Sequence, residues 1–301
     1  MGKTSKDKRD IFYRKAKEVG FRARSAFKLM QIDDEYDLFS GVNRVVDLCA
    51  APGSWCQVLS SKLYAGTDEA NAMVESGEPR IVAVDLQEMA PIPGVVRIQG
   101  DITSQSTAEL IISHFSGNLA DLVVCDGAPD VTGLHDIDEY MQAQLLLAAL
   151  NITTNTLRVG GNFVAKIFRG KDVSLLYSQL RCFFAEVTVA KPKSSRNSSI
   201  ESFVVCRNYS PPPGFVPSMD RLLQSHMYNA SNDMMGPSSL VVPFVACGDL
   251  NGYDADKSYP LQLDESSAEY SYTDPVCPPI KPNYNTYIQR KKSVKDFENS
   301  V

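Results

Sequence analysis

Short apolar runs that end in a polar side chain alternate with longer stretches of helical periodicity along this chain. The runs predict six strands, at residues 42–48, 81–85, 95–99, 121–125, 162–168 and 202–206. Helical stretches are predicted at residues 24–30, from the turn after the first strand to residue 63, and at residues 141–157. Alternating strands and helices indicate βαβ units, and near-continuous apolar strands are typical of a sheet covered by helices on both faces. The predicted fold class is therefore α/β, with a mostly parallel central sheet.

The proline content changes near residue 210 and divides the chain of 301 residues into two parts. Eleven of the 17 prolines lie in residues 211–301. We predict a main domain at residues 1–208, with a basic N-terminal helix, and a proline-rich, partly ordered C-terminal appendage at residues 209–301. Within them, residues 240–250 are expected to be ordered, and the polar segment 65–78 to form a surface insertion. The appendage either docks a partner or packs on its own domain, and the sequence leaves both open.

The formal charge of −6 hides a basic N-terminal arm. Residues 1–28 carry ten Lys and Arg against three Asp and Glu, whereas residues 29–206 carry twelve against 22. A basic arm with interleaved aromatic residues is typical of a protein that neutralises phosphates and stacks on bases. A solvated basic tail is the alternative. The side chains predicted to contact RNA are Lys8, Arg9, Arg22, Arg24 and Arg196.

Simple counts disfavour several classes of protein. No stretch approaches the roughly 18 apolar residues of a membrane span, and the charged N-terminus lacks the apolar core expected of a secretory signal. Seven cysteines without Cys-x-x-Cys spacing argue against a disulfide framework and against a structural zinc site. The three histidines show no metal-ligand spacing, so no metal is expected. A reducing compartment, the cytosol or the nucleus, is predicted.

Four of the predicted strands end at an aspartate, namely Asp47, Asp85, Asp101 and Asp126. Since ligands of open α/β sheets bind outside the carboxyl ends of the strands, these four ends predict a polar ligand. The first turn contains one glycine, Gly53, and lacks both glycine-rich phosphate-binding motifs. Asp85 is placed to accept hydrogen bonds from a ribose diol, although an aspartate that only caps a helix is the alternative. A ribose ligand without a pyrophosphate indicates S-adenosylmethionine.

Two lysines stand in unusual positions. Lys28 lies in the first predicted helix, and Lys166 lies inside a strand whose neighbouring residues are apolar. A buried lysine needs a charged partner or a neutral amine, and burial lowers its pKa, which makes Lys166 a candidate general base. A strand-end lysine that reaches solvent is the alternative. With Asp126 and Glu201 the two lysines can form a charge cluster, and the sequence does not decide the direction in which the pKa of Lys166 moves.

These residues resemble those of the FtsJ-type ribose 2′-O-methyltransferases. The matching motifs are S-x-F-K-L at 25–29, D-L-C-A-A-P-G-S-W at 47–55, V-D-L at 84–86, G-D-I-T at 100–103, D-G-A-P-D at 126–130, V-A-K-I-F-R-G at 164–170 and K-P-x-S-S-R-x-x-S-x-E at 191–201. The resemblance implies a Rossmann-like S-adenosylmethionine-dependent methyltransferase fold. It also implies a catalytic tetrad of Lys28, Asp126, Lys166 and Glu201, with Lys166 as proton acceptor. The cofactor contacts that it implies are Gly53, Trp55, Asp85, Asp101 and Asp126, although plain packing is the alternative for Trp55.

Residues 2–18, 131–136 and 242–250 are similar to the eukaryotic cytosolic tRNA branch of this family. That branch implies cytoplasmic 2′-O-methylation of anticodon-loop nucleotides 32 and 34, with one auxiliary protein for each position. The longer segment 65–78 and Phe21, where this branch has Trp, depart from its pattern. A methyltransferase of ribosomal RNA or of the mRNA cap is the main alternative. A non-catalytic RNA-binding member and a nicotinamide-dependent oxidoreductase are disfavoured by the complete tetrad and by the missing glycine motif.

Overall fold

The computed structural model describes residues 10–129, 134–170, 173–219, 242–260, 272–278 and 280. The elements in chain order are α2 (Ile11–Val19), α3 (Ala26–Tyr36), β1 (Val45–Leu48), α4 (Ser54–Leu63), α5 (Thr67–Glu75), β2 (Ile81–Asp85), β3 (Val95–Gln99), α6 (Gln105–His114), β4 (Ala120–Cys125), α7 (His135–Thr156), β5 (Leu157–Phe168), α8 (Val173–Arg181), β6 (Phe184–Pro192), β7 (Glu201–Tyr209) and β8 (Phe244–Cys247). None of the described helices is long and apolar enough to cross a membrane.

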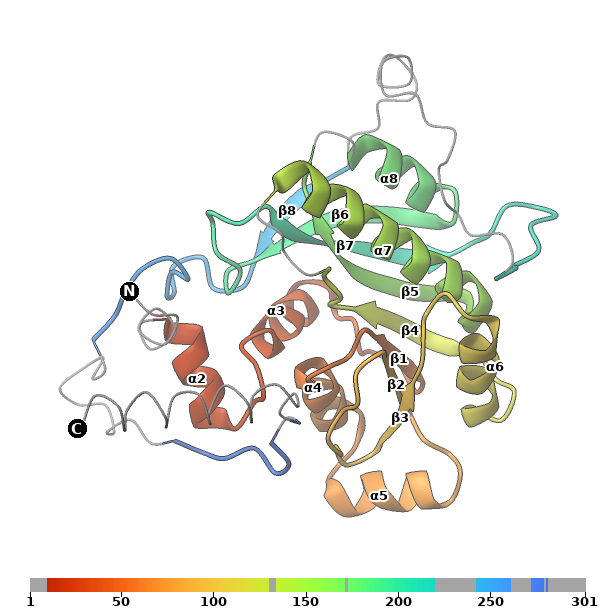
Figure 1. Ribbon diagram of the computed structural model, residues 1–301, viewed down its shortest axis with the longest axis horizontal. Helices are drawn as coiled ribbons and strands as arrows, with labels where there is room; N and C mark the ends of the chain where they lie inside the picture. Colours follow the sequence, from red (N-terminus) through yellow and green to blue (C-terminus); the bar gives the residue numbers. More distant parts are fainter. Residues whose placement is uncertain are drawn as a thin grey trace, which may run out of the picture.

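The strands form one sheet in the order β3-β2-β1-β4-β5-β7-β6-β8 (Figure 1). The pairs from β3 to β5 are parallel, whereas β7 runs antiparallel to both β5 and β6. The strands β1, β2 and β4 are buried almost throughout, as expected where helices cover both faces. The predicted α/β class with a mostly parallel sheet is confirmed.

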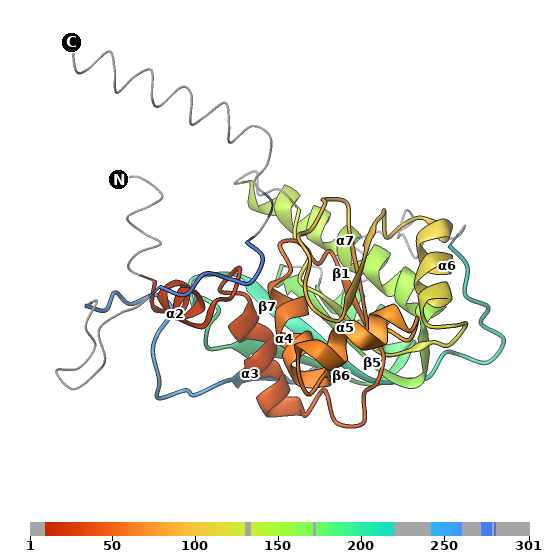
Figure 2. The ribbon, with the colours of Figure 1, turned by 90° about the horizontal axis from the view of Figure 1, so that it is seen from below.

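Two apolar layers separate the sheet from its helices. One layer holds buried residues of α6, α7 and α8, and the other holds buried residues of α3, α4 and α5. Figures 1 and 2 show these two sets of helices on opposite faces of the sheet, with α2 beyond α3 at one end. Side chains alternate between the layers along β5, where Val164 belongs to one layer and Ala165 and Ile167 to the other.

The register of the parallel strands brings their carboxyl ends together. Leu48 at the end of β1 pairs with Val84 in β2 and with Cys125 in β4, and Cys125 pairs with Ala165 in β5. The next residue along β2, β4 and β5 is Asp85, Asp126 or Lys166, respectively. All three therefore lie at the edge of the sheet formed by the carboxyl ends of the parallel strands, called this edge below. The antiparallel pairing of Phe168 with Glu201 adds the start of β7 to the same edge.

Several element boundaries differ from the sequence-based prediction. The segment 65–78 contains helix α5, whose first turn holds Asp68 and Glu69, acidic residues that suit a helix N-terminus. Strands β6 and β8 were not predicted, because β6 mixes polar and apolar residues on an outer position of the sheet. The antiparallel direction of β7 relative to β5 and β6 likewise has no local signal in the sequence.

The described parts of the predicted appendage pack on the rest of the chain. Strand β8 extends the sheet by parallel pairing with β6, with Val189 opposite Phe244, and Cys247 is buried in the core. The expected order around residues 240–250 is thereby confirmed for the part that the structure describes. Residues beyond β8 contact α2, where the Arg14 guanidinium donates to the carbonyls of Tyr259 and Pro260. The predicted boundary between residues 208 and 209 therefore lies inside β7, and β8 beyond it belongs to the same sheet.

Candidate active site

The two lysines and two carboxylates of the predicted tetrad form one connected ion cluster. The Lys28 ammonium lies 2.7 and 2.8 Å from the two carboxylate oxygens of Glu201. The Lys166 ammonium lies 2.7 Å from Asp126 Oδ1 and 3.7 Å from Glu201 Oε2, and it donates to the Asp126 carbonyl at 2.8 Å. Each of the four side chains is only 9–16% exposed. Buried, mutually satisfied charges of this kind hold one another in fixed positions.

The charges of this cluster set the pKa values of its members. Burial works to raise the pKa of Glu201, but the neighbouring Lys28 and Lys166 overcome it and lower this pKa to about 2. Burial works to lower the pKa of Lys166, yet the charges of Asp126 and Glu201 outweigh it and raise the value above the ordinary range. The direction that the sequence left open is therefore upward, and Lys166 is an ammonium at neutral pH.

Three further side chains support the cluster and were not singled out from the sequence. The Ser195 hydroxyl donates to Glu201 Oε1 at 2.6 Å, and buried Lys191 donates to the carbonyls of Ser199 and Glu201 at 2.8 and 2.5 Å. Gln142, in α7, donates to the Lys166 carbonyl at 3.1 Å. The sequence did contain signals for these residues. Ser195 and Lys191 lie inside the motif at 191–201, and Gln142 is a polar residue in an apolar helix.

The predicted cofactor residues lie at the same edge, in the turns after β1, β2 and β3. Asp85 accepts hydrogen bonds from the Ala51 and Gln87 N–H groups at 2.9 and 2.7 Å. Asp101 accepts from the N–H and hydroxyl of Thr103, both at 2.8 Å. Gly53 has a φ of +100°, in the left-handed region that favours glycine, and it opens α4. Partly exposed Asp85 and exposed Asp101 keep accepting capacity for hydroxyl or amine donors of a ligand.

The side chain of Trp55, another predicted cofactor residue, is buried. Its side chain is 2% exposed, packs against Phe203 at a ring-centroid distance of 5.6 Å, and donates from the indole N–H to the Ser25 carbonyl at 2.9 Å. The side chain is therefore packed in the core, as the packing alternative for Trp55 describes.

The five basic residues predicted to contact RNA are partly outside the described structure and partly engaged within the protein. Lys8 and Arg9 lie outside the described residues. Arg22 is 6% exposed, and its guanidinium donates to backbone carbonyls in the described structure, so its charge is less accessible than the prediction of an RNA contact assumed. Arg24 and Arg196 both pair with the buried carboxylate of Asp10, which also caps α2, so they carry less free positive charge than the sequence suggested.

Asp47 is a buried carboxylate beneath the cofactor residues. It is fully buried and accepts a hydrogen bond from the Cys56 thiol at 2.9 Å. Burial raises its pKa to about 7, against the effect of that hydrogen bond, and the charges of Asp126 and Asp85 add to the increase. The carboxylates of Asp126 and Asp85 are thus close enough to disfavour the ionised form of Asp47.

Replacing Asp47 with asparagine should stabilise the ligand-free protein at alkaline pH. Because the pKa of Asp47 is higher in the folded than in the unfolded chain, its contribution is favourable below about pH 4 and is lost as pH rises through about 7. Asparagine has no charge to lose. The gain in melting temperature over wild type should grow by at least about 4 °C from pH 5 to pH 8 in calorimetry. An equal difference at both pH values would contradict the assigned burial penalty.

The profile of a family described as FtsJ-like methyltransferase matches residues 21–209, a segment that contains the whole tetrad. This chain belongs to the FtsJ-like methyltransferase family. Strands β1 to β7 and the turns that carry the predicted cofactor residues all lie within the matched segment.

Relatives of this FtsJ-like methyltransferase extend beyond that segment. Proteins named tRNA (cytidine(32)/guanosine(34)-2′-O)-methyltransferase are 63% identical in Mus musculus and 64% identical in Homo sapiens, over 97% of this chain and 87% and 86% of their own lengths. The crystal structure of a ribosomal RNA methyltransferase from Plasmodium falciparum superposes with a TM-score of 0.53 at 26% identity. It covers 64% of this chain and 100% of that chain. The appendage is therefore shared with the tRNA relatives.

Proposed function

We propose that this protein transfers a methyl group from S-adenosylmethionine to the ribose 2′-hydroxyl of tRNA anticodon-loop nucleotides 32 and 34. The observation that carries the proposal is the similarity to tRNA (cytidine(32)/guanosine(34)-2′-O)-methyltransferases over 97% of the chain, appendage included. The complete Lys28–Asp126–Lys166–Glu201 cluster supports the reaction class, because an alcohol needs an oriented proton acceptor to act as a nucleophile.

The chemistry of the cofactor residues fits S-adenosylmethionine. This edge carries the carboxylates of Asp85, Asp101 and Asp126, and the charges of Asp85 and Asp126 act on Asp47 beneath them. Such a set suits a nucleoside that carries positive charge and no phosphate. When bound, S-adenosylmethionine supplies an activated methyl group on a sulfonium. Asp85 would hold the ribose hydroxyls, Asp101 would accept from the base amine, and the turn at Gly53 would approach the ligand with its backbone.

Within the cluster, Lys166 is proposed to position the 2′-hydroxyl and to receive its proton. Asp126 and Glu201 fix the ammonium in place, and Lys28 neutralises Glu201 from the other side. Because the raised pKa of Lys166 keeps the amine protonated, the proton must leave before Lys166 accepts another one. The positive charges of the two lysines also favour an approaching phosphodiester backbone.

The rate of methyl transfer should therefore rise with pH. The neutral fraction of Lys166 increases about tenfold per pH unit below its pKa, so the single-turnover rate should rise with a logarithmic slope of about 1 between about pH 6.5 and 8.5. Cofactor affinity is measured at each pH, so that titration of Asp47 is separated from that of Lys166. A flat single-turnover profile at saturating cofactor would contradict the role of Lys166 as proton acceptor.

The proposal includes the partners and compartment that the sequence predicts. tRNA is the substrate, one auxiliary protein selects each nucleotide, and the cytoplasm is the compartment. The described segments of the appendage pack on this chain, so a partner would meet a preformed surface in that region.

An assay on unmodified tRNA tests the proposal. tRNA from cells that lack the protein is incubated with S-adenosylmethionine, the recombinant protein and an extract of the same cells, which supplies auxiliary proteins. Mass spectrometry of nuclease fragments should show a new ribose methyl group at nucleotides 32 and 34. New methyl groups confined to ribosomal RNA or to the mRNA cap would overturn the tRNA assignment and favour the alternative substrates.

A further inference from the structure

The buried guanidinium of Arg22 connects three separate backbone segments. Its Nη1 donates to the carbonyls of Pro52 at 2.9 Å and Ala90 at 3.0 Å, and its Nη2 donates to Pro91 at 2.7 Å. Its Nε donates to the carbonyl of Cys277 at 2.9 Å. An arginine presents its N–H groups in a rigid planar fork, so four carbonyls held in this way have fixed relative positions.

Two of these segments border the proposed cofactor site. Pro52 belongs to the turn between β1 and α4, and the N–H of the preceding Ala51 donates to Asp85. Residues 90–91 belong to the loop between β2 and β3, which Arg97 also holds through the carbonyl of Met89 at 2.7 Å. Arg22 thus sets the spacing between the turn after β1 and the loop after β2.

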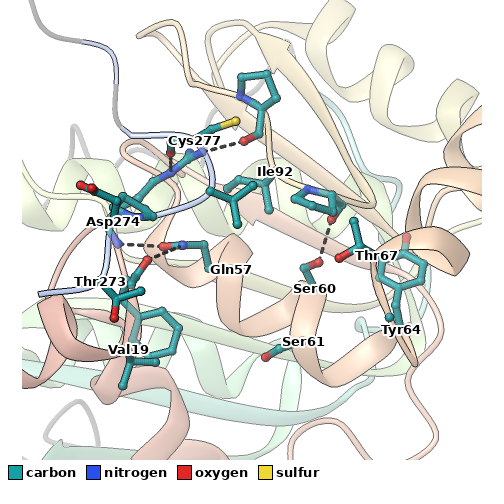
Figure 3. A pocket seen from close by; sticks show the side chains of 18 of the residues that line it. Val19, Gln57, Ser60, Ser61, Tyr64, Thr67, Ile92, Thr273, Asp274 and Cys277 are labelled. Carbon is teal, nitrogen blue, oxygen red and sulfur yellow. Dashed lines mark hydrogen bonds between the residues drawn. The ribbon is translucent and has the colours of Figure 1, made fainter. Parts of the chain in front are cut away.

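The third segment lies far away in the sequence. Residues 272–278 follow the family-matched region by more than 60 positions, and the Thr273 N–H also donates to the Lys17 carbonyl of α2 at 3.0 Å. Figure 3 shows Thr273, Asp274 and Cys277 of this segment beside Gln57 and Ile92. The segment forms one wall of a cavity of about 500 Å³ whose other walls include α4 and residues 91–93.

We propose that Arg22 is a positioning residue that couples residues 272–278 to the two cofactor loops, so that docking of this C-terminal segment increases affinity for S-adenosylmethionine. The inference rests on the proposed function. It assigns a role in cofactor binding to residues 272–278, which lie outside the segment 21–209 that matches the family. The side chain acts through the loops, because its donors are all directed at backbone carbonyls.

The experiment compares full-length Arg22→Gln with full-length Arg14→Gln. Arg14 is a matched control, because its guanidinium is equally buried and donates to carbonyls of the appendage at residues 259–260, but not to a cofactor loop. Calorimetric titration with S-adenosylmethionine alone should show affinity at least about tenfold weaker for Arg22→Gln, since each hydrogen bond from a charged donor contributes that much. Affinity in Arg14→Gln should stay within about twofold, and kcat of Arg22→Gln at saturating cofactor within about threefold.

A second full-length variant tests the coupling and does not depend on Arg22→Gln folding well. Thr273→Pro removes the N–H that the Lys17 carbonyl accepts, so it should loosen residues 272–278 and weaken cofactor affinity. In the double variant the two losses should be less than additive, because both act through the same docked segment.

Three results are decisive. Wild-type protein that binds no S-adenosylmethionine would overturn the proposed function. If wild type binds, equal affinity in Arg22→Gln or equal losses in Arg22→Gln and Arg14→Gln would overturn the role of Arg22. Fully additive losses in the double variant would overturn the coupling to residues 272–278, and subadditive losses would support it.

Discussion

Replacing Lys166 with alanine should lower the single-turnover rate of methyl transfer by at least about 1000-fold, while affinity for S-adenosylmethionine stays within about threefold. The reason is geometric. The Lys166 ammonium is the group that contacts both Asp126 and Glu201, and it is 9% exposed at the edge where the strands end. Without it, the amine proposed to receive the proton of the 2′-hydroxyl is missing, whereas the turns that hold the proposed cofactor residues keep their backbone contacts.

Two further variants sharpen this prediction. Lys166→Met keeps the apolar stem of the side chain, so its packing is retained and its rate should fall as far as that of the alanine variant. Lys62→Met removes another lysine that is 2.7 Å from a carboxylate, that of Asp33, but at the end of α4 remote from the cluster. Its rate should match wild type. Retention of more than about a tenth of the wild-type rate in either Lys166 variant would contradict the assignment.

Replacing Glu201 with glutamine should lower the free energy of unfolding by about 3 kcal/mol, because it leaves two buried lysines with one carboxylate. The rate of methyl transfer should fall by at least about 100-fold, since Lys28 and Lys166 both lose the anion that orients them. Glutamine preserves the size of the side chain and its capacity to accept from Ser195. Denaturant unfolding and single-turnover assays measure the two effects.

The pH dependence of this loss follows from the pKa of Glu201, which is about 2 in the folded protein. A lowered carboxyl pKa contributes stability above its ordinary value, and that stability is lost as pH falls toward the folded value. The difference between Glu201→Gln and wild type should therefore shrink between about pH 5 and pH 3. Glu186→Gln removes an exposed carboxylate of β6 that lies 3.9 Å from Arg207, and it should cost less than about 0.5 kcal/mol. Equal costs for both variants would contradict the cluster as a stabilising unit.

The edge of the sheet that carries the site was predictable because local signals and topology agree there. Each of the strands β1, β2 and β4 is a short apolar run, and parallel strands bring Asp85, Asp126 and Lys166 to one edge without further information. The tetrad also lies in motifs, so its members could be named from the sequence. The direction of the pKa shift of Lys166 could not, because burial and ion pairing oppose each other and only distances decide between them.

The contacts that the sequence did not indicate share a physical cause. A basic residue in the sequence carries no sign of the partner that occupies it, and Arg22 is held by carbonyls up to 255 positions away. Arg24 and Arg196 converge on Asp10, and no local pattern predicts the pairing of Asp10 with a residue 186 positions away. Similarly, β8 pairs with β6, and β6 is in place to accept it only after β6 has paired with β7. Contacts between segments distant in the sequence are therefore what the structure adds.

We infer that this chain methylates tRNA ribose through the cluster of Lys28, Asp126, Lys166 and Glu201. The most direct test is nucleoside mass spectrometry of anticodon-loop fragments from cells that lack the protein, rescued with wild type or with Lys166→Ala expressed at the same level. We expect 2′-O-methyl groups at nucleotides 32 and 34 to disappear in these cells and only wild type to restore them. Restoration by Lys166→Ala, or unchanged methylation of the anticodon loop in the cells without the protein, would contradict it.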